Sequence, residues 1–255
     1  MLSIDLSNKV ALVTGATGEL GSVIVRTLSS CGAKVVINYR DKAKVAERLC
    51  EEINGTGRSA MTWKADICVG EDVERMRAGV KERFGSADII VTAAVIQYTP
   101  WQGVLHEPVE NYHSQFASSV LQNVLMAKAF LPDMILKGWG RVIGINTECS
   151  MQCWEKQSAY ISGKRGMDGL LRVLAKEVGP HNITVNQVAP GWIASANRPE
   201  EDTPYQQAYK KAIPLRRRGS PQEVANSVAF LASDLANFIT GLYLPVSGGN
   251  VMPTI

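Results

Sequence analysis

The stretch Lys9-Val10-Ala11-Leu12-Val13-Thr14-Gly15-Ala16-Thr17-Gly18-Glu19-Leu20-Gly21 contains the features that decide the fold. Its first six residues are mostly apolar and predict a buried β-strand. Three glycines follow in a G-x-x-G-x-x-G spacing, and residues 19–31 have the period of an amphipathic helix. Glycine lets a backbone approach a pyrophosphate, and a helix N-terminus supplies free N–H donors. The stretch therefore predicts either a nucleotide-binding loop or a tight turn without a ligand.

Strand-like segments alternate with helical ones along the rest of the chain. The strand-like segments are Lys9–Thr14, Lys34–Tyr39, Ser59–Lys64, Asp88–Thr92, Arg141–Ile145, Ile183–Val188 and Leu242–Val246. The amphipathic segments lie near 19–31, 41–53, 70–84, 110–137, 157–178 and 221–233. This alternation predicts an α/β fold, a doubly wound parallel sheet of seven strands with helices on both faces, of the Rossmann type.

No linker, internal repeat or low-complexity segment divides the 255 residues, so we expect a single domain over 1–255. In such folds the ligand binds at the carboxyl ends of the strands. The segment 194–218 is polar and contains prolines, with no clear period before Gln206. This pattern is compatible with a substrate flap over the site and equally with an ordinary surface excursion.

The composition narrows the class of protein. The net charge is +3 and 20% of the residues are charged, which does not favour nucleic acid as a partner. Neither an apolar signal segment nor a membrane-spanning run is visible, so we expect no membrane association. Five cysteines without a paired framework predict reduced thiols and a cytoplasmic protein, and three dispersed histidines predict no metal site.

The end of the second predicted strand bears on the choice of nucleotide. In dinucleotide-binding folds an acidic residue at this place binds the 2′-hydroxyl of NAD, whereas a basic residue suits the 2′-phosphate of NADP. This strand ends in Ile37-Asn38-Tyr39-Arg40, and Arg40 is a forked cation well shaped for phosphate. We therefore expect NADP(H) to be favoured over NAD(H). Asp41 directly follows, and Arg40 as an ordinary surface charge is the alternative.

Tyr160 and Lys164 lie four residues apart at the start of the predicted helix 157–178. Positions i and i+4 share one side of a helix, so the phenol and the ammonium should be neighbours. A nearby cation favours the phenolate, and we expect it to lower the pKa of Tyr160 from its usual value of about 10. The pair then predicts a proton donor and acceptor for an alcohol or a carbonyl.

The chain as a whole resembles the short-chain dehydrogenase/reductase superfamily over nearly its whole length. It is most similar to the compact single-domain members, which include the 3-oxoacyl-thioester (acyl-carrier-protein) reductases. The motifs that carry the resemblance are Thr14–Gly21, Ala65-Asp66-Ile67, Tyr160-x-x-x-Lys164, Asn186-Gln187-Val188-Ala189-Pro190-Gly191-Trp192-Ile193, Ile239-Thr240-Gly241 and Val246-Ser247-Gly248-Gly249.

The resemblance implies a small-molecule carbonyl or alcohol substrate and a homo-oligomer, a tetramer or dimer, built through the helices 110–137 and 157–178. It implies that Tyr160 donates a proton while Lys164 binds the nicotinamide ribose. The expected cofactor-binding residues are Gly15, Thr17, Gly18, Glu19, Leu20, Tyr39, Arg40, Asp66, Ile67, Thr92, Ala93, Ala94, Tyr160, Lys164, Pro190, Gly191 and Ile193.

Four positions depart from the family pattern. Thr147 stands where the family has a serine that polarises the carbonyl, and a shift of register would nominate Asn146 or Glu148 instead. Ser119 stands where an asparagine completes a proton relay; Asn123 is one turn later and is not the aligned residue. Thr92 opens a Thr-Ala-Ala sequence in place of Asn-Ala-Gly. Finally, Glu19 brings a carboxylate near the expected phosphates, so it should point to solvent.

Two functions are compatible with these residues. The first is an NADPH-dependent reductase of a ketone or 3-oxoacyl carbonyl, with Tyr160, Lys164, Thr147 and Ser119 as its catalytic residues. The second is a weak or inactive NADP-binding module that acts as a sensor or partner subunit. An open pocket shared by Thr147 and Tyr160 would favour the enzyme.

The substrate is less well defined by the sequence. Trp154, Met151 and Trp192 suggest an apolar wall, and Glu148 a polar or cationic substrate group, although core packing and solvent exposure are the respective alternatives. The run Arg216-Arg217-Arg218 could attract an anionic carrier or could be a solvated charge run.

Overall fold

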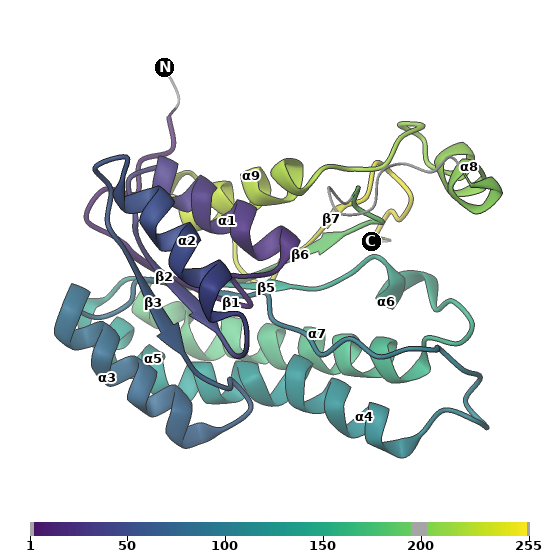
Figure 1. Ribbon diagram of the computed structural model, residues 1–255, viewed down its shortest axis with the longest axis horizontal. Coiled ribbons are helices and arrows are strands. Elements are labelled where there is room, and N and C mark those ends of the chain that lie inside the picture. Colours follow the sequence, from purple (N-terminus) through teal and green to yellow (C-terminus); the bar gives the residue numbers. More distant parts are fainter. Residues whose placement is uncertain (1–2, 195–202, 254–255) are drawn as a thin grey trace.

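The computed structural model describes residues 3–194 and 203–253 of the chain. Within them seven parallel strands form one sheet in the order β3-β2-β1-β4-β5-β6-β7 (Figure 1). The strands are β1 (Val10–Thr14), β2 (Lys34–Tyr39), β3 (Ala60–Lys64), β4 (Ile89–Thr92), β5 (Gly140–Ile145), β6 (Ile183–Pro190) and β7 (Tyr243–Val246). Each predicted strand is present, and the predicted doubly wound parallel sheet is confirmed.

Helices cover both faces of the sheet (Figure 1). One face carries α1 (Glu19–Ser30), α2 (Ala43–Asn54) and α9 (Pro221–Ala232), and the other carries α3 (Gly70–Phe84), α4 (Val109–Phe116), α5 (Gln122–Lys137) and α7 (Ser158–Val178). Shorter helical elements are the π-helical η1 (Ala117–Leu121), α6 (Cys149–Gln152), η2 (Gly179–His181), α8 (Pro204–Ala212) and η3 (Asp234–Ala236).

The strands are apolar on both sides because each side faces a separate core. In β1, Ala11 and Val13 belong to the cluster beneath α1 and α9, whereas Val10 and Leu12 belong to the cluster beneath α3, α5 and α7. A parallel sheet buried on both faces requires such continuous apolar runs. The strand order reverses between β1 and β4, so a crevice is expected at the carboxyl ends of these strands.

The segment 110–137, predicted as one helix, is interrupted by the π-helical turn η1. Polar side chains around the turn bond to main-chain carbonyls of the helix: Ser118 Oγ donates to Ser114 O over 2.8 Å, and Asn123 Nδ2 donates to Ser119 O over 2.7 Å. Such bonds compete with the regular α-helical pattern, which gives a local reason for the altered turn.

The predicted flap 194–218 contains a helix that its sequence does not show clearly. Residues 195–202 lie outside the described part of the chain. Helix α8 begins at Pro204, and a capping box between Thr203 and Gln206 caps its N-terminus. The helix therefore starts before Gln206, where the hydrophobic period of the sequence begins. Among the described helices, none has the length and apolarity that a membrane span requires.

Candidate active site

Two adjoining cavities open at the carboxyl ends of the strands. The first, which we call the loop cavity, has a volume of about 350 Å³ and is lined by the glycine-rich turn, the end of β2, the segments 65–68 and 93–97, and Ser118. The second, which we call the aromatic cavity, has a volume of about 390 Å³ and is lined by Thr147, Tyr160 and several large aromatic side chains. Both cavities are lined by Ile96 and Gln97, so they adjoin each other.

The glycine-rich turn brings the backbone close to the loop cavity. Gly15 has a φ of +63°, and a Cβ atom there would lie 2.7 Å from Ala94 Cα, so no larger residue fits. Gly18 is the N-cap of α1 and has no capping side chain, which leaves N–H groups of the first turn available to a ligand. Gly15, Thr17 and Gly18 line this cavity. The turn therefore fits the pyrophosphate of a dinucleotide.

The backbone at the end of β4 is held by two side chains that the sequence analysis did not single out. Thr14 Oγ1 accepts hydrogen bonds from the amides of Ala93 and Ala94, each over 3.1 Å. Gln122 Nε2 donates to Ala94 O over 2.7 Å. Ala93 and Ala94 consequently line the loop cavity, whereas Thr92 turns away from it and donates to Asn123 Oδ1 over 2.8 Å.

The far end of the loop cavity contains Tyr39, Arg40, Asp66 and Ile67, as predicted for the adenosine part of a dinucleotide. Lys42 also lines it, and this second cation was not predicted. Its signal was available in the sequence, because it follows Arg40 by two positions at the end of a strand. Arg40 Nε is bound to Asp41 over 2.8 Å, and its Nη1 lies 4.0 Å from Asp66.

Other residues predicted to bind the cofactor do not line either cavity. Leu20 packs against the core. Glu19 is not among the residues that line the loop cavity; it lines a neighbouring hollow with Arg26 and Arg48. Pro190 is buried at the end of β6, where its carbonyl accepts from the Glu148 amide over 3.0 Å.

The segment after Pro190 divides between the aromatic cavity and the core. Gly191 lines the aromatic cavity, and a Cβ atom on it would lie 2.9 Å from the Tyr209 hydroxyl. Ile193 lines neither cavity. It forms a bridge to Gly219 and packs against the core.

Tyr160, Thr147 and Lys164 lie close together, but only two of them border a cavity. Tyr160 and Thr147 both line the aromatic cavity. Lys164 is buried beside them: its Nζ lies 6.0 Å from the centre of the Tyr160 ring and donates to Ile145 O over 2.6 Å. The ammonium is therefore held below the phenol by the last residue of β5.

The pKa values of this pair are governed by burial. Burial raises the pKa of Tyr160, with a further increase from the Cys149 thiol, while the neighbouring Thr147 hydroxyl lowers it. Burial also lowers the pKa of Lys164 to about 8. From the sequence we expected the pKa of Tyr160 to be lowered. The pKa is raised instead, and loss of hydration on burial is the largest cause.

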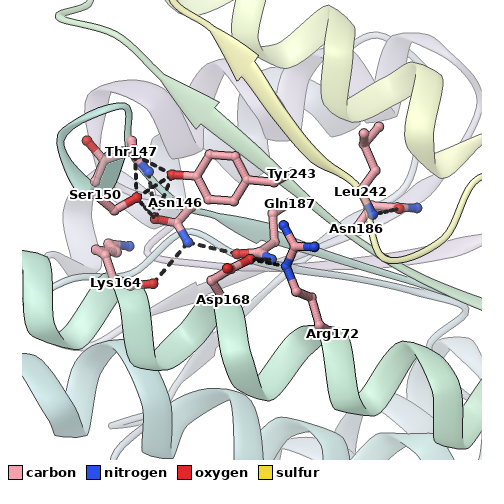
Figure 2. A network of polar contacts seen from close by, with 10 residues as sticks. All are labelled: Asn146, Thr147, Ser150, Lys164, Asp168, Arg172, Asn186, Gln187, Leu242 and Tyr243. Atoms are coloured by element: carbon pink, nitrogen blue, oxygen red, sulfur yellow. Dashed lines mark hydrogen bonds and ion pairs between the residues drawn. The ribbon is translucent and has the colours of Figure 1, made fainter. Parts of the chain in front are cut away.

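A buried network fixes Thr147 relative to α7 (Figure 2). Asn146 Oδ1 accepts from the Thr147 amide over 2.9 Å, and Asn146 Nδ2 donates to Lys164 O and to Gln187 Oε1. Gln187 Nε2 in turn donates to Asp168 over 2.8 Å. The side chain of Asn146 is fully engaged in this network and does not line the aromatic cavity, whereas Thr147 lines it together with Tyr160.

Ser119 occupies the π-helical turn and lines neither cavity. Its hydroxyl is buried and finds no hydrogen-bond partner among the described residues. Its carbonyl already accepts from Asn123 Nδ2. The structure thus brings Ser119 near the site through its backbone only, and Asn123 holds that carbonyl.

Glu148, next to Thr147, joins four segments of the chain. Its Oε1 accepts from the Tyr209 hydroxyl over 2.6 Å, and its Oε2 accepts from Asn250 Nδ2 over 3.0 Å. The Tyr209 oxygen also accepts from the Trp192 amide over 2.7 Å. The carboxylate therefore connects the end of β5 with the end of β6, α8 and the C-terminal segment. Burial raises the pKa of Glu148.

Comparison with known proteins gives one consistent answer. The family profile described as enoyl-(acyl carrier protein) reductase matches residues 15–250. The chain belongs to the short-chain dehydrogenase/reductase family. A Staphylococcus epidermidis protein named 3-oxoacyl-(acyl-carrier-protein) reductase FabG is 34% identical to it over 96% of this chain and 100% of its own length.

More distant members of the short-chain dehydrogenase/reductase family match as well. A Rhizobium meliloti D-beta-hydroxybutyrate dehydrogenase is 29% identical over 94% of this chain and 98% of its own length. The structure of a doubly substituted mutant of a Serratia marcescens short-chain dehydrogenase/reductase superimposes with a TM-score of 0.88 at 28% identity, covering 96% of this chain and 98% of that one. This chain is therefore an oxidoreductase of the family.

Proposed function

We propose that this oxidoreductase transfers hydride from NADPH to a ketone or 3-oxoacyl-type carbonyl, and that the reverse reaction oxidises a secondary alcohol. The observation that carries the proposal is the open aromatic cavity, which is lined by Thr147 and Tyr160 and adjoins the loop cavity. A carbonyl placed there would lie next to a nicotinamide held by the residues of the loop cavity. The relatives named as reductases of 3-oxoacyl carriers support this substrate class.

The side chains provide the proton chemistry of the reaction. The Thr147 hydroxyl donates a hydrogen bond to the carbonyl oxygen and orients it. Tyr160 donates the proton that turns this oxygen into a hydroxyl, since its phenol is protonated at neutral pH. When bound, the cofactor supplies the hydride. Lys164 would hold the ribose next to the nicotinamide, and Ser119 would contribute its main-chain carbonyl to a water-mediated relay.

The preference for NADP(H) over NAD(H) rests on two cations. Arg40 and Lys42 line the end of the loop cavity where a 2′-phosphate would lie. Asp41 competes for Arg40, so phosphate binding has to displace an exposed ion pair. Exposed pairs contribute little stability, typically below about 1 kcal/mol, and a phosphate can replace the carboxylate at small cost.

The alternative function, a binding module without turnover, requires a blocked reaction site. No described side chain fills the space between Thr147 and the aromatic walls, because that space is the cavity of about 390 Å³. We therefore favour the enzyme. A homo-oligomer, a cytoplasmic location and a substrate flap over 194–218 remain predictions.

The test is a titration of the purified protein with NADPH and NADH, followed by a panel of ketones and 3-oxoacyl thioesters. We expect NADPH to bind more tightly and to be oxidised by at least one member of the panel. Nucleotide binding without any turnover would favour the binding module. Failure to bind either nucleotide would contradict the proposed role of the loop cavity.

A further inference from the structure

Aromatic rings make up about half of the residues that line the aromatic cavity. Besides Tyr160, the lining rings are Tyr98, Trp101, Trp154, Trp192, Tyr205 and Tyr209. Trp192 contacts two of them, with ring centres 5.5 Å from Tyr205 and 5.2 Å from Tyr209. Trp154 meets Tyr205 edge-on at 6.5 Å. These rings come from four separate segments and surround the space in front of Thr147.

A buried carboxylate stands among these rings. Glu148 lines the cavity, yet only 2% of its surface is exposed. Each of its oxygens accepts one hydrogen bond, from Tyr209 and Asn250 respectively. A carboxylate offers about four lone-pair positions, so acceptor capacity is left for a ligand. The described lining residues include no lysine, arginine or histidine that could balance the charge of Glu148.

A second acceptor points to the same kind of ligand. Gln157 lines the aromatic cavity and is 7% exposed. Its Oε1 atom is buried and has no hydrogen-bond donor among the described residues. A buried acceptor without a donor is costly, and a ligand with a polar hydrogen would relieve that cost.

The nearby arginines do not provide an anion site at this cavity. Arg217 is paired with Glu223, and Arg216 donates to Lys211 O. Arg218 stacks on the Trp192 ring at 4.5 Å and donates to the carbonyls of Trp192 and Ile193. None of the three lines the aromatic cavity. These arginines therefore give no reason to expect an anionic group of the substrate inside this cavity.

We infer that the substrate is a ketone that carries a protonated amine, held between the aromatic rings and Glu148 while its carbonyl faces Thr147 and Tyr160. This inference rests on the proposed carbonyl reductase activity and names its substrate class. Aromatic faces attract a cation through their quadrupole, most strongly when the cation is desolvated. The ammonium also balances the buried carboxylate, which a neutral acyl chain cannot do.

The test uses two ketones of the same shape, N-methylpiperidin-4-one and 4-methylcyclohexanone, at neutral pH. The first is a protonated amine and the second is its neutral counterpart. We expect kcat/KM of the wild-type protein to be about tenfold higher for the amine, within the range of cation–aromatic contacts. In Glu148→Gln this ratio should fall towards one. Glu155→Gln, which alters an exposed carboxylate outside the cavity, is the matched control and should keep the wild-type ratio.

A binding measurement separates this inference from the proposed function. Trp101, Trp154 and Trp192 line the cavity, so quenching of tryptophan fluorescence reports binding without turnover. N-methylpiperidin-4-ol should bind about tenfold more tightly than 4-methylcyclohexanol, again by the strength of cation–aromatic contacts. Equal or weaker binding of the amine, or an unchanged ratio in Glu148→Gln, would overturn the inference. If no ketone is reduced but the amine still binds selectively, the proposed function fails and the cation site stands.

Discussion

The two cavities are built in different ways. The loop cavity is formed where a glycine turn and the uncapped start of α1 meet the ends of β1, β2 and β4. The aromatic cavity is formed by side chains from the segments after β4, β5 and β6 and from α8. A backbone site depends on the fold, whereas a side-chain site changes with each substitution. We therefore expect the proposed cofactor site to follow from the fold, and the choice of substrate to depend on the side chains of the aromatic cavity.

The substitution Tyr160→Phe should have the largest effect, and it alters only one of the two cavities. It removes the proton donor of the aromatic cavity and leaves the loop cavity untouched. Turnover of a ketone should fall by about 10²–10⁴-fold, the usual contribution of general acid catalysis, while the affinity for NADPH stays the same. Tyr205→Phe, a change in an exposed ring of the same cavity, is the control. Full turnover in Tyr160→Phe would remove the phenol from the mechanism.

Arg40→Ala tests the other cavity. Loss of a charge-assisted contact with the 2′-phosphate should weaken NADPH binding by about tenfold to a hundredfold, since such hydrogen bonds contribute about 1.5–3 kcal/mol. NADH binding should barely change. The matched variant Asp41→Asn should strengthen NADPH binding, because Arg40 loses its competing partner. Equal losses of affinity for NADPH and NADH would show that Arg40 does not bind the 2′-phosphate.

The substitution Tyr209→Phe tests how much the hydrogen bonds of the Tyr209 hydroxyl stabilise the aromatic cavity. The substitution leaves the Trp192 amide without its acceptor and Glu148 without one donor. Unsatisfied buried groups cost about 1–3 kcal/mol each, so we expect the free energy of unfolding in urea to fall by about 2 kcal/mol. The KM for the ketone should rise more than kcat falls. A variant as stable as the wild type would mean that water replaces the hydroxyl.

The substitution Lys164→Met should have the smallest effect. It is measured as a change in the free energy of unfolding, which is independent of activity. Burial lowers the pKa of Lys164 to about 8 in the folded protein, against 10.5 for a free lysine, so the folded state binds this proton less tightly. This weaker proton binding destabilises the folded state. The destabilisation has its full size below pH 8 and declines as the pH rises towards 10.5. Replacing the lysine should therefore increase the free energy of unfolding at neutral pH by about 1–2 kcal/mol, after loss of the bond to Ile145 O.

The control for this prediction is the pH dependence of unfolding. The gain in Lys164→Met should shrink between pH 8 and 10.5, because the wild type regains stability over that range as the ammonium deprotonates in the folded state. A gain independent of pH would point to better packing by methionine and not to removal of a buried charge.

The sequence predicted the backbone site better than the side-chain site, for a physical reason. Strand periods and glycine spacing are local, and they placed Gly15, Gly18 and Arg40 correctly around the loop cavity. Glu148 depends on Tyr209 and Asn250, which lie 61 and 102 positions away, and no local period connects such residues. Trp154 and Trp192 were predicted as a wall and do line the cavity, but Met151 does not.

The direction of the Tyr160 pKa was missed for a related reason. Spacing alone places a cation near the phenol, but it does not report how much water both groups lose on folding. In the structure burial is the largest influence on each of them. The π-helical turn at Ala117–Leu121 was missed as well, since its polar residues fit an ordinary helical period.

The hydrogen bond from Asn250 to Glu148 makes the C-terminal segment part of the reaction site. An affinity tag fused directly after Ile255 would begin only five residues beyond this contact. Protease trimming ahead of residue 250 would remove the contact altogether. Assays of specificity are therefore best made with an N-terminal or cleaved tag, and a truncated preparation should be recognised by its altered choice of ketone before any loss of nucleotide binding.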